Sequence, residues 1–409
     1  MNDNRLVFHC DCNNFFASCE CLEHPELRDV PMAVAGDPEN RTGVVVAKNE
    51  LAKAYGVRTA DTVWQARRKC PEIVFVPPRH HYYREISDRI NRIYREYTDY
   101  VEPASIDESY LDMTGAPGYF GQDPRQLADT LRARVRTGIG ITISVGVSYN
   151  KIFAKMGSDY RKPDATTVIT PDNYRDILWP LPVSDLMFAG RSAAALLNRK
   201  SVFTVGDLAR ADPAQLREWL GRGGEQLWLY ANGQDASPVR LWGDMPEIKS
   251  VSRGRTYRKD LTGEREVLAG ISELSDHIAR TLRRHGMKGC VIQVQIKTPE
   301  LRVISRQISL DHYTCLHHEI RDVSMRLIRT HWQIGPNAPI RALTVGVTGL
   351  VPADRDAQQT DLFDLLSEAR GEAVSGKLRE KQEKLEAAVD SLRQKYGDGT
   401  ITLGFREQK

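Results

Sequence analysis

The segment SIDESYLD places two acidic residues, Asp107 and Glu108, side by side among residues that favour β-strands. Adjacent carboxylates repel each other, and in a flat strand their side chains would point to opposite faces. A tight turn between two strands would instead direct both side chains toward one place. A third acid, Asp11, ends the first strand-like segment of the chain, so three carboxylates can meet at one edge of a sheet.

Carboxylates that converge repel unless a cation neutralises them, and hard oxygen ligands suit Mg²⁺. Two such ions about 4 Å apart can activate a hydroxyl and stabilise a leaving pyrophosphate in an in-line displacement. The alternative is that Asp107 and Glu108 are turn residues and Asp11 merely ends a strand, because acidic turns are common. Spacing alone leaves both interpretations open.

The chain also has seven cysteines, an odd number. Two C-x-C pairs near the start suggest zinc, but zinc sites usually use C-x₂₋₄-C spacing with a matching second pair or histidines. We therefore favour reduced, semi-buried thiols over zinc or disulfides. The cysteines are Cys10, Cys12, Cys19, Cys21, Cys70, Cys290 and Cys315.

A chain of 409 residues, with 41% hydrophobic and 27% charged residues, predicts two to four globular units. No apolar run reaches the ~18–20 residues that span a bilayer, and the start of the chain does not resemble a secretory signal. We expect a cytoplasmic protein with no membrane association. Net charge is only +3, but basic residues are in excess between positions 244 and 350. Such charge suits phosphate contacts or an ordinary solvated face.

Hydrophobic periodicity predicts a β-α-β-β-α-β unit, a split βαβ arrangement, in the first part of the chain. The expected strands are 5–11, 101–106, 109–113 and 141–147. The first expected helix is 83–100, with Ile86, Ile90, Ile93 and Tyr97 on one stripe. The second expected helix carries Leu127, Leu131 and Val135.

The same element order recurs later. Its expected strands are 249–257, 291–297, 301–309 and 340–348, and its expected helices are 264–285 and about 320–330. Ile292, Val294 and Ile296 alternate with polar residues, so one sheet face should be apolar for the helices and the other polar and uncovered. An open polar face in a basic unit suits docking on a nucleic-acid backbone.

Between the two units, residues 172–238 read as short helices with two glycine turns, FAGR and GRGG. Such turns can present backbone N–H groups to a phosphate, although glycine turns are also common for structural reasons. After Pro352 the chain becomes polar, and residues 368–396 are charged and helix-prone. We expect a linker or tail there.

Three stretches resemble the core motifs of the Y-family DNA polymerases, and the closest branch is the DNA polymerase IV group of bacterial translesion enzymes. They are HCDCNNFFASCE (9–20), SIDESYLD (105–112) and SVGVSYNKIFAKMGSDYRKPD (144–164), and the likeness runs in order from about residue 5 to 350. The resemblance implies an α+β multidomain fold, a right-hand polymerase. Its parts would be a ferredoxin-like palm (1–14 and 79–170), small fingers (15–78), a helical thumb with helix-hairpin-helix turns (171–238), a linker (239–248), a βαββαβ little finger (249–350) and a tail (351–409).

The resemblance also implies roles for individual residues. Two Mg²⁺ ions would be held by Asp11, Asp107, Glu108 and the backbone carbonyl of Cys12. Phe16 would be a steric gate whose ring excludes the ribose 2′-hydroxyl. The incoming nucleotide's triphosphate would meet the backbone N–H groups of Asn14 and Phe15 and the side chains of Lys53 and Lys162.

The fingers depart from the family pattern. Lys53 stands where the family usually has an arginine, so the charge is kept and the bidentate fork is lost. Ala47 and Glu50 replace a frequent threonine and tyrosine that touch the triphosphate. An acid near phosphates is unfavourable unless it faces away, so nucleotide binding should differ in detail.

The remaining implied contacts concern DNA and a sliding clamp. DNA phosphates would meet the turn glycines Gly190, Gly221 and Gly223 and the arginines Arg253, Arg255, Arg302 and Arg306. The segment QTDLF fits the bacterial clamp-binding pattern, in which Leu362 and Phe363 fill an apolar pocket while Gln359 and Asp361 complete the motif.

We expect a monomeric, template-directed DNA polymerase that extends primers without a proofreading exonuclease, and the resemblance implies low fidelity and extension past damaged bases. Its partners would be primer-template DNA, a deoxynucleoside triphosphate and the sliding clamp. One rival is a non-catalytic relative that bridges DNA and the clamp. Another is a nucleotide cyclase, which can use a similar palm and two metals but has no use for a thumb or a second sheet domain.

Overall fold

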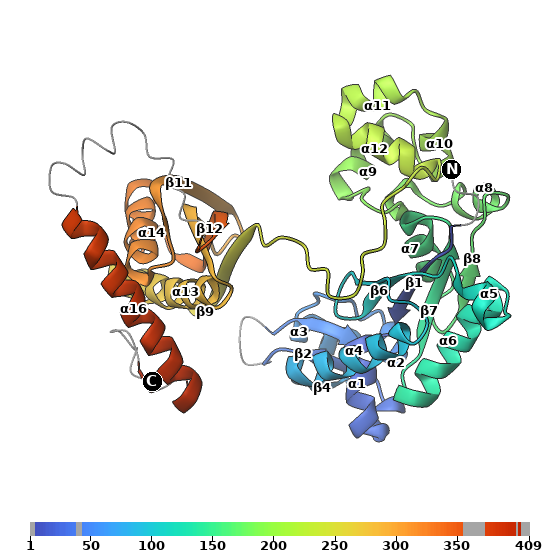
Figure 1. The fold of residues 1–409 in the computed structure, drawn as a ribbon, viewed down its shortest axis with the longest axis horizontal. Helices are drawn as coiled ribbons and strands as arrows, with labels where there is room; N and C mark the ends of the chain where they lie inside the picture. The colour runs from blue at the N-terminus through green and yellow to red at the C-terminus, as the bar shows by residue number, and fades with distance from the viewer. Residues whose placement is uncertain (1–4, 38–42, 355–372, 398–399, 402–409) are drawn as a thin grey trace. The chain divides into compact units, whose positions relative to one another are not determined.

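The computed structural model describes residues 5–37, 43–354, 373–397 and 400–401. The chain divides into two compact units, Met1–Met245 and Pro246–Lys409 (Figure 1). Each unit has its own hydrophobic core, so each is described by itself.

A five-stranded sheet forms the centre of the first unit, with strand order β5-β6-β1-β7-β8. Its central strand β1 is antiparallel to both β6 and β7, as expected for a split βαβ unit, and β8 adds a parallel edge. The bounds are β1 Val7–Cys12, β5 Val101–Pro103, β6 Glu108–Asp112, β7 Ile143–Ser148 and β8 Thr166–Val168.

Helices cover both faces of this sheet. The side chains of α1 (Phe15–Glu23), α4 (His80–Arg95) and α6 (Pro124–Ile139) share one core with Phe8 and Cys10 of β1, and α7 (Lys151–Tyr160) packs on β1 and β7 from the other side. The predicted apolar stripe of α4 is confirmed, since Ile86, Ile90 and Ile93 are buried.

The strand predicted for residues 101–106 is too long. It ends at Pro103, because the backbone N–H groups of Ala104 and Ser105 both donate to the carbonyl of Glu108 and so form a turn. The helix predicted for 83–100 also shifts, because α4 begins at His80 and ends at Arg95.

A smaller sheet with strand order β3-β2-β4 lies between β1 and α4 in the sequence. It has a separate core that includes Ala33, Val45 and Ala52. Its helices begin at proper caps, because Asn49 and Thr62 each accept a hydrogen bond from the first turn that follows. The bounds are η1 Pro25–Arg28, β2 Met32–Ala35, β3 Val45–Lys48, α2 Glu50–Ala54, α3 Val63–Lys69 and β4 Val74–Val76.

Short helices follow the five-stranded sheet, as predicted, and they share a core with Ile152, Phe153 and Met156 of α7. Their bounds are α8 Tyr174–Leu178, η2 Val183–Asp185, α9 Arg191–Arg199, α10 Val205–Arg210, α11 Pro213–Leu220 and α12 Arg222–Ala231, and the five-stranded sheet adds α5 Ala116–Phe120.

The predicted linker 239–248 is partly packed on the first unit. Val239 is buried beside Val7 of β1, and the backbone N–H of Arg240 donates to Glu102 at 2.9 Å. The boundary between the two units lies at Met245, within the range given for the linker.

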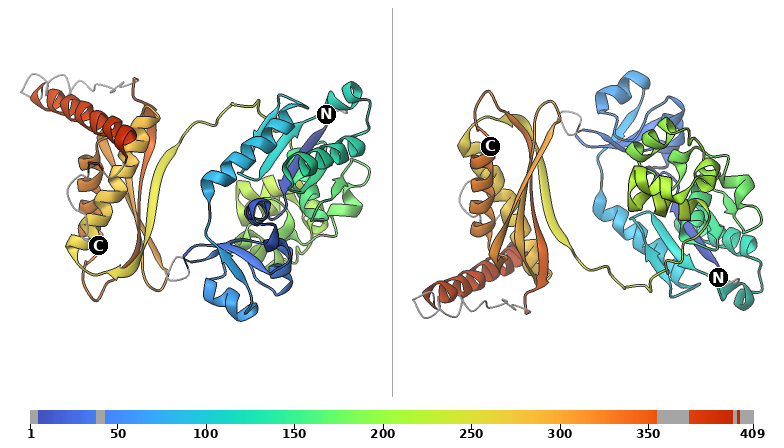
Figure 2. Two further views of the ribbon diagram at one scale, coloured as in Figure 1. Left: turned by 90° about the horizontal axis from the view of Figure 1, so that it is seen from below. Right: turned by 90° about the horizontal axis from the view of Figure 1, so that it is seen from above.

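The second unit repeats the element order β-α-β-β-α-β but not the strand order. Its sheet runs β11-β10-β12-β9, so the last strand lies inside the sheet, whereas in the first unit the first strand does. Both helices lie against one face of this sheet (Figure 2). The bounds are β9 Ser250–Leu261, α13 Glu264–Arg284, β10 Met287–Lys297, β11 Val303–Thr314, α14 His317–His331 and β12 Ile340–Pro352.

The charged segment that we expected to be a linker or tail forms a long helix, α16 (Ala373–Tyr396), against the second unit. Ion pairs hold it there, which corrects the prediction. Glu386 meets Arg283 of α13 at 2.5 Å, and Arg393 meets Asp276 at 2.9 Å. A helix can thus dock through charged side chains when each finds an opposite partner.

Within the described ranges, no helix combines the length and the apolar character that crossing a membrane requires.

Candidate active site

Strand register brings two of the three predicted acids together. Asp11 in β1 lies directly across from Glu108 in β6. Asp107 precedes β6, and its backbone carbonyl accepts a hydrogen bond of 3.0 Å from the N–H of Cys12. The turn before β6 therefore places all three acidic residues at the same end of the sheet.

Two lysines neutralise these acids. The Nζ of Lys155 lies 2.6 Å from Glu108 Oε1 and 3.3 Å from Asp11 Oδ2. The Nζ of Lys162 lies 2.6 Å from the same oxygen of Asp11 and 2.7 Å from Asp159 Oδ1. Because both lysines belong to or follow α7, the packing of this helix on β1 delivers the positive charge.

Burial and charge compete in the acids. Burial raises the pKa of Asp11 to about 6 although Lys162 and Lys155 act in the opposite direction. Burial also acts to raise the pKa of Glu108, but contacts with His9 and Lys155 outweigh it and hold that pKa well below its usual range. Glu108 is therefore a carboxylate at neutral pH. A cation beside Asp11 and Glu108 stabilises these two acids.

A buried histidine lies next to Glu108. His9, two residues before Asp11 in β1, is fully buried, and its Nδ1 lies 2.8 Å from Ser158 Oγ. Its Nε2 lies 3.6 Å from Glu108 Oε2. Burial lowers the pKa of His9, so the imidazole is neutral at neutral pH.

The third acid points elsewhere. Asp107 Oδ1 accepts a hydrogen bond of 2.6 Å from the Ser105 hydroxyl. In the part of the chain that the structure describes, no group of three histidine, cysteine or acidic side chains is arranged around a metal position. The oxygen ligands themselves suit Mg²⁺, and Lys155 Nζ already bridges Asp11 and Glu108 as a cation would. The residues therefore fit a magnesium site whose cation position the lysines share.

The cysteines near these acids are thiols, as we favoured. All seven are free, and only Cys290 is not buried. Burial raises the pKa of the Cys10 and Cys12 thiols, so they are protonated and are poor zinc ligands.

Two of the predicted nucleotide-binding residues, Asn14 and Lys53, contact Glu50. Asn14 caps α1 with a left-handed backbone, φ 50°, and its Nδ2 donates to Glu50 Oε1 at 3.0 Å. Lys53 Nζ lies 3.3 Å from Glu50 Oε2. The hydrogen bond from Asn14, more than the nearby lysines, lowers the pKa of Glu50. Glu50 therefore stays charged and ties the small sheet to the start of α1.

The predicted gate Phe16 has a fixed support. Its ring stacks on Tyr83 of α4 with ring centroids 4.3 Å apart. Tyr83 is fully buried, and its hydroxyl donates to Glu20 at 2.5 Å. Arg79 also pairs with Glu20, at 2.6 Å. The neighbouring Phe15 is buried in the core, which leaves its backbone as the group available to a ligand.

No role for Lys155, His9 or Tyr83 was predicted from the sequence, although Lys155 lies in the motif 144–164 and His9 opens the motif 9–20. A signal for Lys155 was present, because Asp159 follows it by four residues and makes an i,i+4 pair at 3.5 Å. Its two other partners come from different strands, so only the sheet register reveals them.

The three turn glycines in the helical segment lie in open surroundings. A Cβ at Gly190, Gly221 or Gly223 would meet no atom within 4 Å. Gly221 has φ 64°, which favours glycine, and it separates α11 from α12. There is space for a ligand beside these glycines, but the N–H groups of Gly190 and Gly221 already donate to the carbonyls of Phe188 and Arg217, both at 2.9 Å.

The second-unit arginines divide by face. Register pairs Arg253 with Val345, Arg255 with Leu343 and Arg306 with Val294, so these three share the side that the helices cover. Arg255 forms an ion pair with Glu273 of α13, and Arg302 lies in the turn between β10 and β11. The opposite face is polar, as predicted, and carries Ser252, Gln293, Gln295, Ser305, Gln307 and Thr344.

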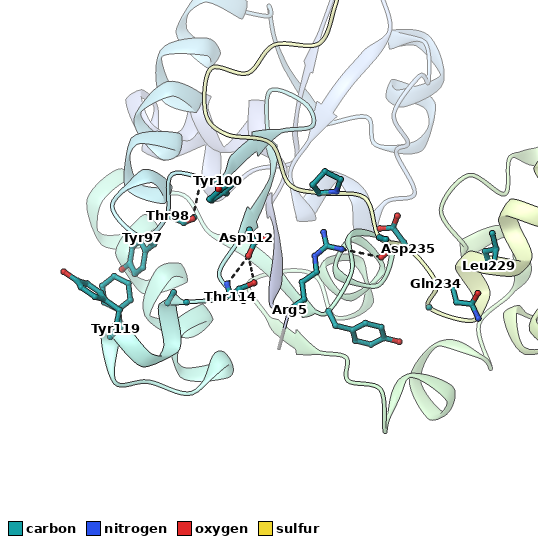
Figure 3. Close-up of a pocket in the computed structure, with 17 residues that line it drawn as sticks. Arg5, Tyr97, Thr98, Tyr100, Asp112, Thr114, Tyr119, Leu229, Gln234 and Asp235 are labelled. Atoms are coloured by element: carbon teal, nitrogen blue, oxygen red, sulfur yellow. Dashed lines mark hydrogen bonds between the residues drawn. The ribbon is translucent and has the colours of Figure 1, made fainter. Parts of the chain in front are cut away.

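A cavity of about 1100 Å³ lies at the other end of β1 and β6 from the acids (Figure 3). Arg5 precedes β1 and reaches the carbonyl of Asp235, while Asp112 ends β6 and accepts from Thr114. The walls of the cavity carry Tyr97, Tyr100 and Tyr119, so the cavity is an aromatic feature separate from the acids.

The clamp motif, Gln359–Phe363, lies outside the described residues.

Comparison with known proteins identifies the chain's relatives. Residues 10–159 match the model of the impB/mucB/samB family, and residues 248–362 match the model of that family's C-terminal domain. The DNA polymerase IV of Acetivibrio thermocellus is 42% identical over 98% of this chain and 97% of its own length. The DNA polymerase IV 1 of Bacillus subtilis is 34% identical over 99% of this chain and 94% of its own.

The fold has a solved counterpart. A Y-family DNA polymerase chimera, Dbh-Dpo4(243-245)-Dbh, superposes with a TM-score of 0.74 over 85% of this chain and 99% of its own, at 23% sequence identity. This likeness concerns the fold, a mixed α/β arrangement with several sheets. The chain therefore belongs to the impB/mucB/samB family of Y-family DNA polymerases, within the DNA polymerase IV group.

Proposed function

We propose that the chain is a template-directed DNA polymerase that extends primers, with low fidelity, past damaged bases and without a proofreading exonuclease. The observation that carries the proposal is the register of Asp11 with Glu108, with Asp107 in the adjoining turn. Nucleotidyl transfer needs closely spaced carboxylates at an accessible sheet edge.

The palm residues would bind and orient the reacting groups. Asp11, Asp107, Glu108 and the carbonyl of Cys12 would hold two Mg²⁺ ions, which when bound supply positive charge to the primer 3′-hydroxyl and the leaving pyrophosphate. For this the Asp107 carboxylate must leave Ser105. Ser158 orients the ring of His9, whose Nε2 lies 3.6 Å from Glu108 Oε2, so His9 would limit the movement of that carboxylate.

The fingers and α7 would bind the triphosphate. Lys162 and Lys53 provide positive charge, and the backbone N–H groups of Asn14 and Phe15 provide donors. Each of these lysines has an acidic partner in the structure, so a triphosphate must compete with Asp11 and Asp159 for Lys162 and with Glu50 for Lys53. Phe16, held by Tyr83, would meet the sugar edge and exclude a 2′-hydroxyl.

DNA would be held by the helical segment of the first unit and by the second unit. The exposed turns at Gly190, Gly221 and Gly223 would lie against phosphates, and there the N–H groups of Gly190 and Gly221 would have to exchange their present acceptors, the carbonyls of Phe188 and Arg217. The polar face of the little finger would lie along the duplex, with Arg253, Arg255, Arg302 and Arg306 adding charge near its edges. Gln359, Asp361, Leu362 and Phe363 would bind a sliding clamp. We expect the enzyme to act as a monomer in the cytoplasm.

The test is primer extension by the purified full chain with primer-template, deoxynucleoside triphosphates and Mg²⁺. Asp107→Asn combined with Glu108→Gln should abolish extension while thermal unfolding shows a folded protein. Asp112→Asn is the matched control, because it removes an acid from the far end of the same strand β6, and it should extend normally. Extension that survives the double change would refute the site assignment.

A further inference from the structure

One cation contacts three acids of the palm. Lys155 Nζ lies 2.6 Å from Glu108, 3.3 Å from Asp11 and 3.5 Å from Asp159. Its side chain is only 19% exposed. The packing of α7 on β1 and β7 directs this side chain between the two strands that carry Asp11 and Glu108.

The acids need such a cation before any metal arrives. Asp11 and Glu108 are directly opposed across antiparallel strands, where Cβ atoms lie about 4.5–5.5 Å apart. Their side chains are 7% and 25% exposed, so water screens their repulsion poorly. Lys155 is the one side chain in the described residues whose ammonium group forms ion pairs with both of these acids.

Asp159 offers this lysine another position. It lies one helical turn after Lys155, is half exposed, and is not among the expected metal ligands. It also binds Lys162 at 2.7 Å. If a metal occupied the space between Asp11 and Glu108, Asp159 could keep both lysines neutralised.

We propose that Lys155 is a positioning residue that acts as an internal counter-ion for the metal site. It holds Asp11 and Glu108 together in the metal-free enzyme, gives up this position to Mg²⁺, and then pairs with Asp159. The inference rests on the proposed function, because it takes Asp11 and Glu108 to be magnesium ligands. Lys155 and Asp159 then set the metal affinity in opposite directions.

The test measures the melting temperature of the DNA-free full chain against MgCl₂ concentration, with ionic strength held constant by KCl and an EDTA reference. Lys155→Met removes the competing charge and keeps the length of the side chain. The Lys155→Met change should lower the melting temperature in EDTA. It should also lower the apparent Mg²⁺ dissociation constant about tenfold, because one contact ion pair in a partly buried site no longer competes with the metal. Asp159→Asn should weaken Mg²⁺ binding, because both lysines then keep the metal acids as their partners.

Lys151→Met is the matched control. Lys151 belongs to the same helix and pairs with Glu102 at 2.5 Å, away from the metal acids. It should lower the melting temperature equally with and without Mg²⁺.

The outcomes separate this inference from the proposed function. A wild-type chain that responds to Mg²⁺, together with a Lys155→Met variant that binds Mg²⁺ equally or more weakly, overturns the role of Lys155 alone. The second outcome is that Mg²⁺ changes the melting temperature of the wild-type chain no more than it changes that of the Asp11→Asn variant. That result overturns both the metal site and the counter-ion role of Lys155. If Lys155→Met does not fold, Asp159→Asn decides, and unchanged or tighter Mg²⁺ binding by that variant refutes the proposal.

Discussion

Replacing Glu386 should weaken the packing of helix α16 against the second unit. The Glu386 side chain is 5% exposed, and its partner Arg283 in α13 is 12% exposed. Glu386 also accepts the backbone N–H of His317, the first residue of α14, at 3.1 Å. Since Leu316 stands at the N-cap of α14 and has no side-chain acceptor, this distant carboxylate serves as the cap.

The cost follows from these contacts. Breaking a buried ion pair costs about 3–5 kcal/mol, but Asp390 remains 2.7 Å from Arg283 and offsets part of this. The lost cap adds about 1 kcal/mol. For Glu386→Ala we expect a loss of about 3 kcal/mol, which lowers the melting temperature of a domain of this size by about 6–12 °C. Glu386→Gln should cost less, because its amide oxygen can still accept the N–H of His317.

The assay is differential scanning calorimetry of the full chain, in which the first unit serves as an internal reference. Lys381→Ala, an exposed change in the same helix, is the control and should shift neither transition. If Glu386→Ala shifts the second-unit transition no more than Lys381→Ala, α16 does not dock through this carboxylate and the reasoning fails.

Three other predictions concern the palm, the gate and pH. Gly146→Ala should destabilise the first unit by about 3 kcal/mol, because its Cβ would lie 1.8 Å from the carbonyl of Ala154 in α7; Gly118→Ala, with open space around it, is the control in thermal unfolding, and equal shifts would contradict the packing. Phe16→Ala should raise the ratio of ribonucleotide to deoxynucleotide incorporation, and Tyr83→Leu, which removes the stacked support, should raise it partially; an unchanged ratio in both would remove Phe16 from the gate. Hydrogen bonds from the protonated His312 ring to Glu319 and Asp311 raise the pKa of His312, so its contribution to stability is complete below its unfolded pKa near 6.5 and is lost as pH rises through the raised value. His312→Gln should flatten the pH dependence of urea unfolding above pH 6.5, and a slope equal to that of the wild type would exclude His312 as its source.

Local patterns predicted the elements better than their arrangement. The apolar stripe of α4 and the alternation in β10 follow from periodicity, which neighbouring residues alone determine. The strand orders of the two sheets do not follow, because both units share one element order. The two units differ in how the hairpin pairs with the rest of the sheet: β10 pairs with the last strand, β12, in the second unit, whereas β6 pairs with the first strand, β1, in the first unit.

The candidate site shows the same limit. The convergence of Asp11 with Glu108 could be expected from a split βαβ unit, but the Asn14–Glu50–Lys53 contacts join the N-cap of α1 to the separate helix α2. The docking of α16 was missed because its charged residues favour a solvated tail by composition. Their partners, from Asp276 to Glu319, lie far away in the sequence.

The cap of α14 also has a consequence for how the chain is made. Glu386 lies 69 residues after His317, so the ribosome releases all six elements of the second unit before the residue that completes α14. During that interval the N-terminus of α14 and the guanidinium group of Arg283 lack this partner. The docking of α16 therefore follows the synthesis of the other six elements of the second unit, and chains truncated before α16 should be more readily cleaved by proteases than chains that include it.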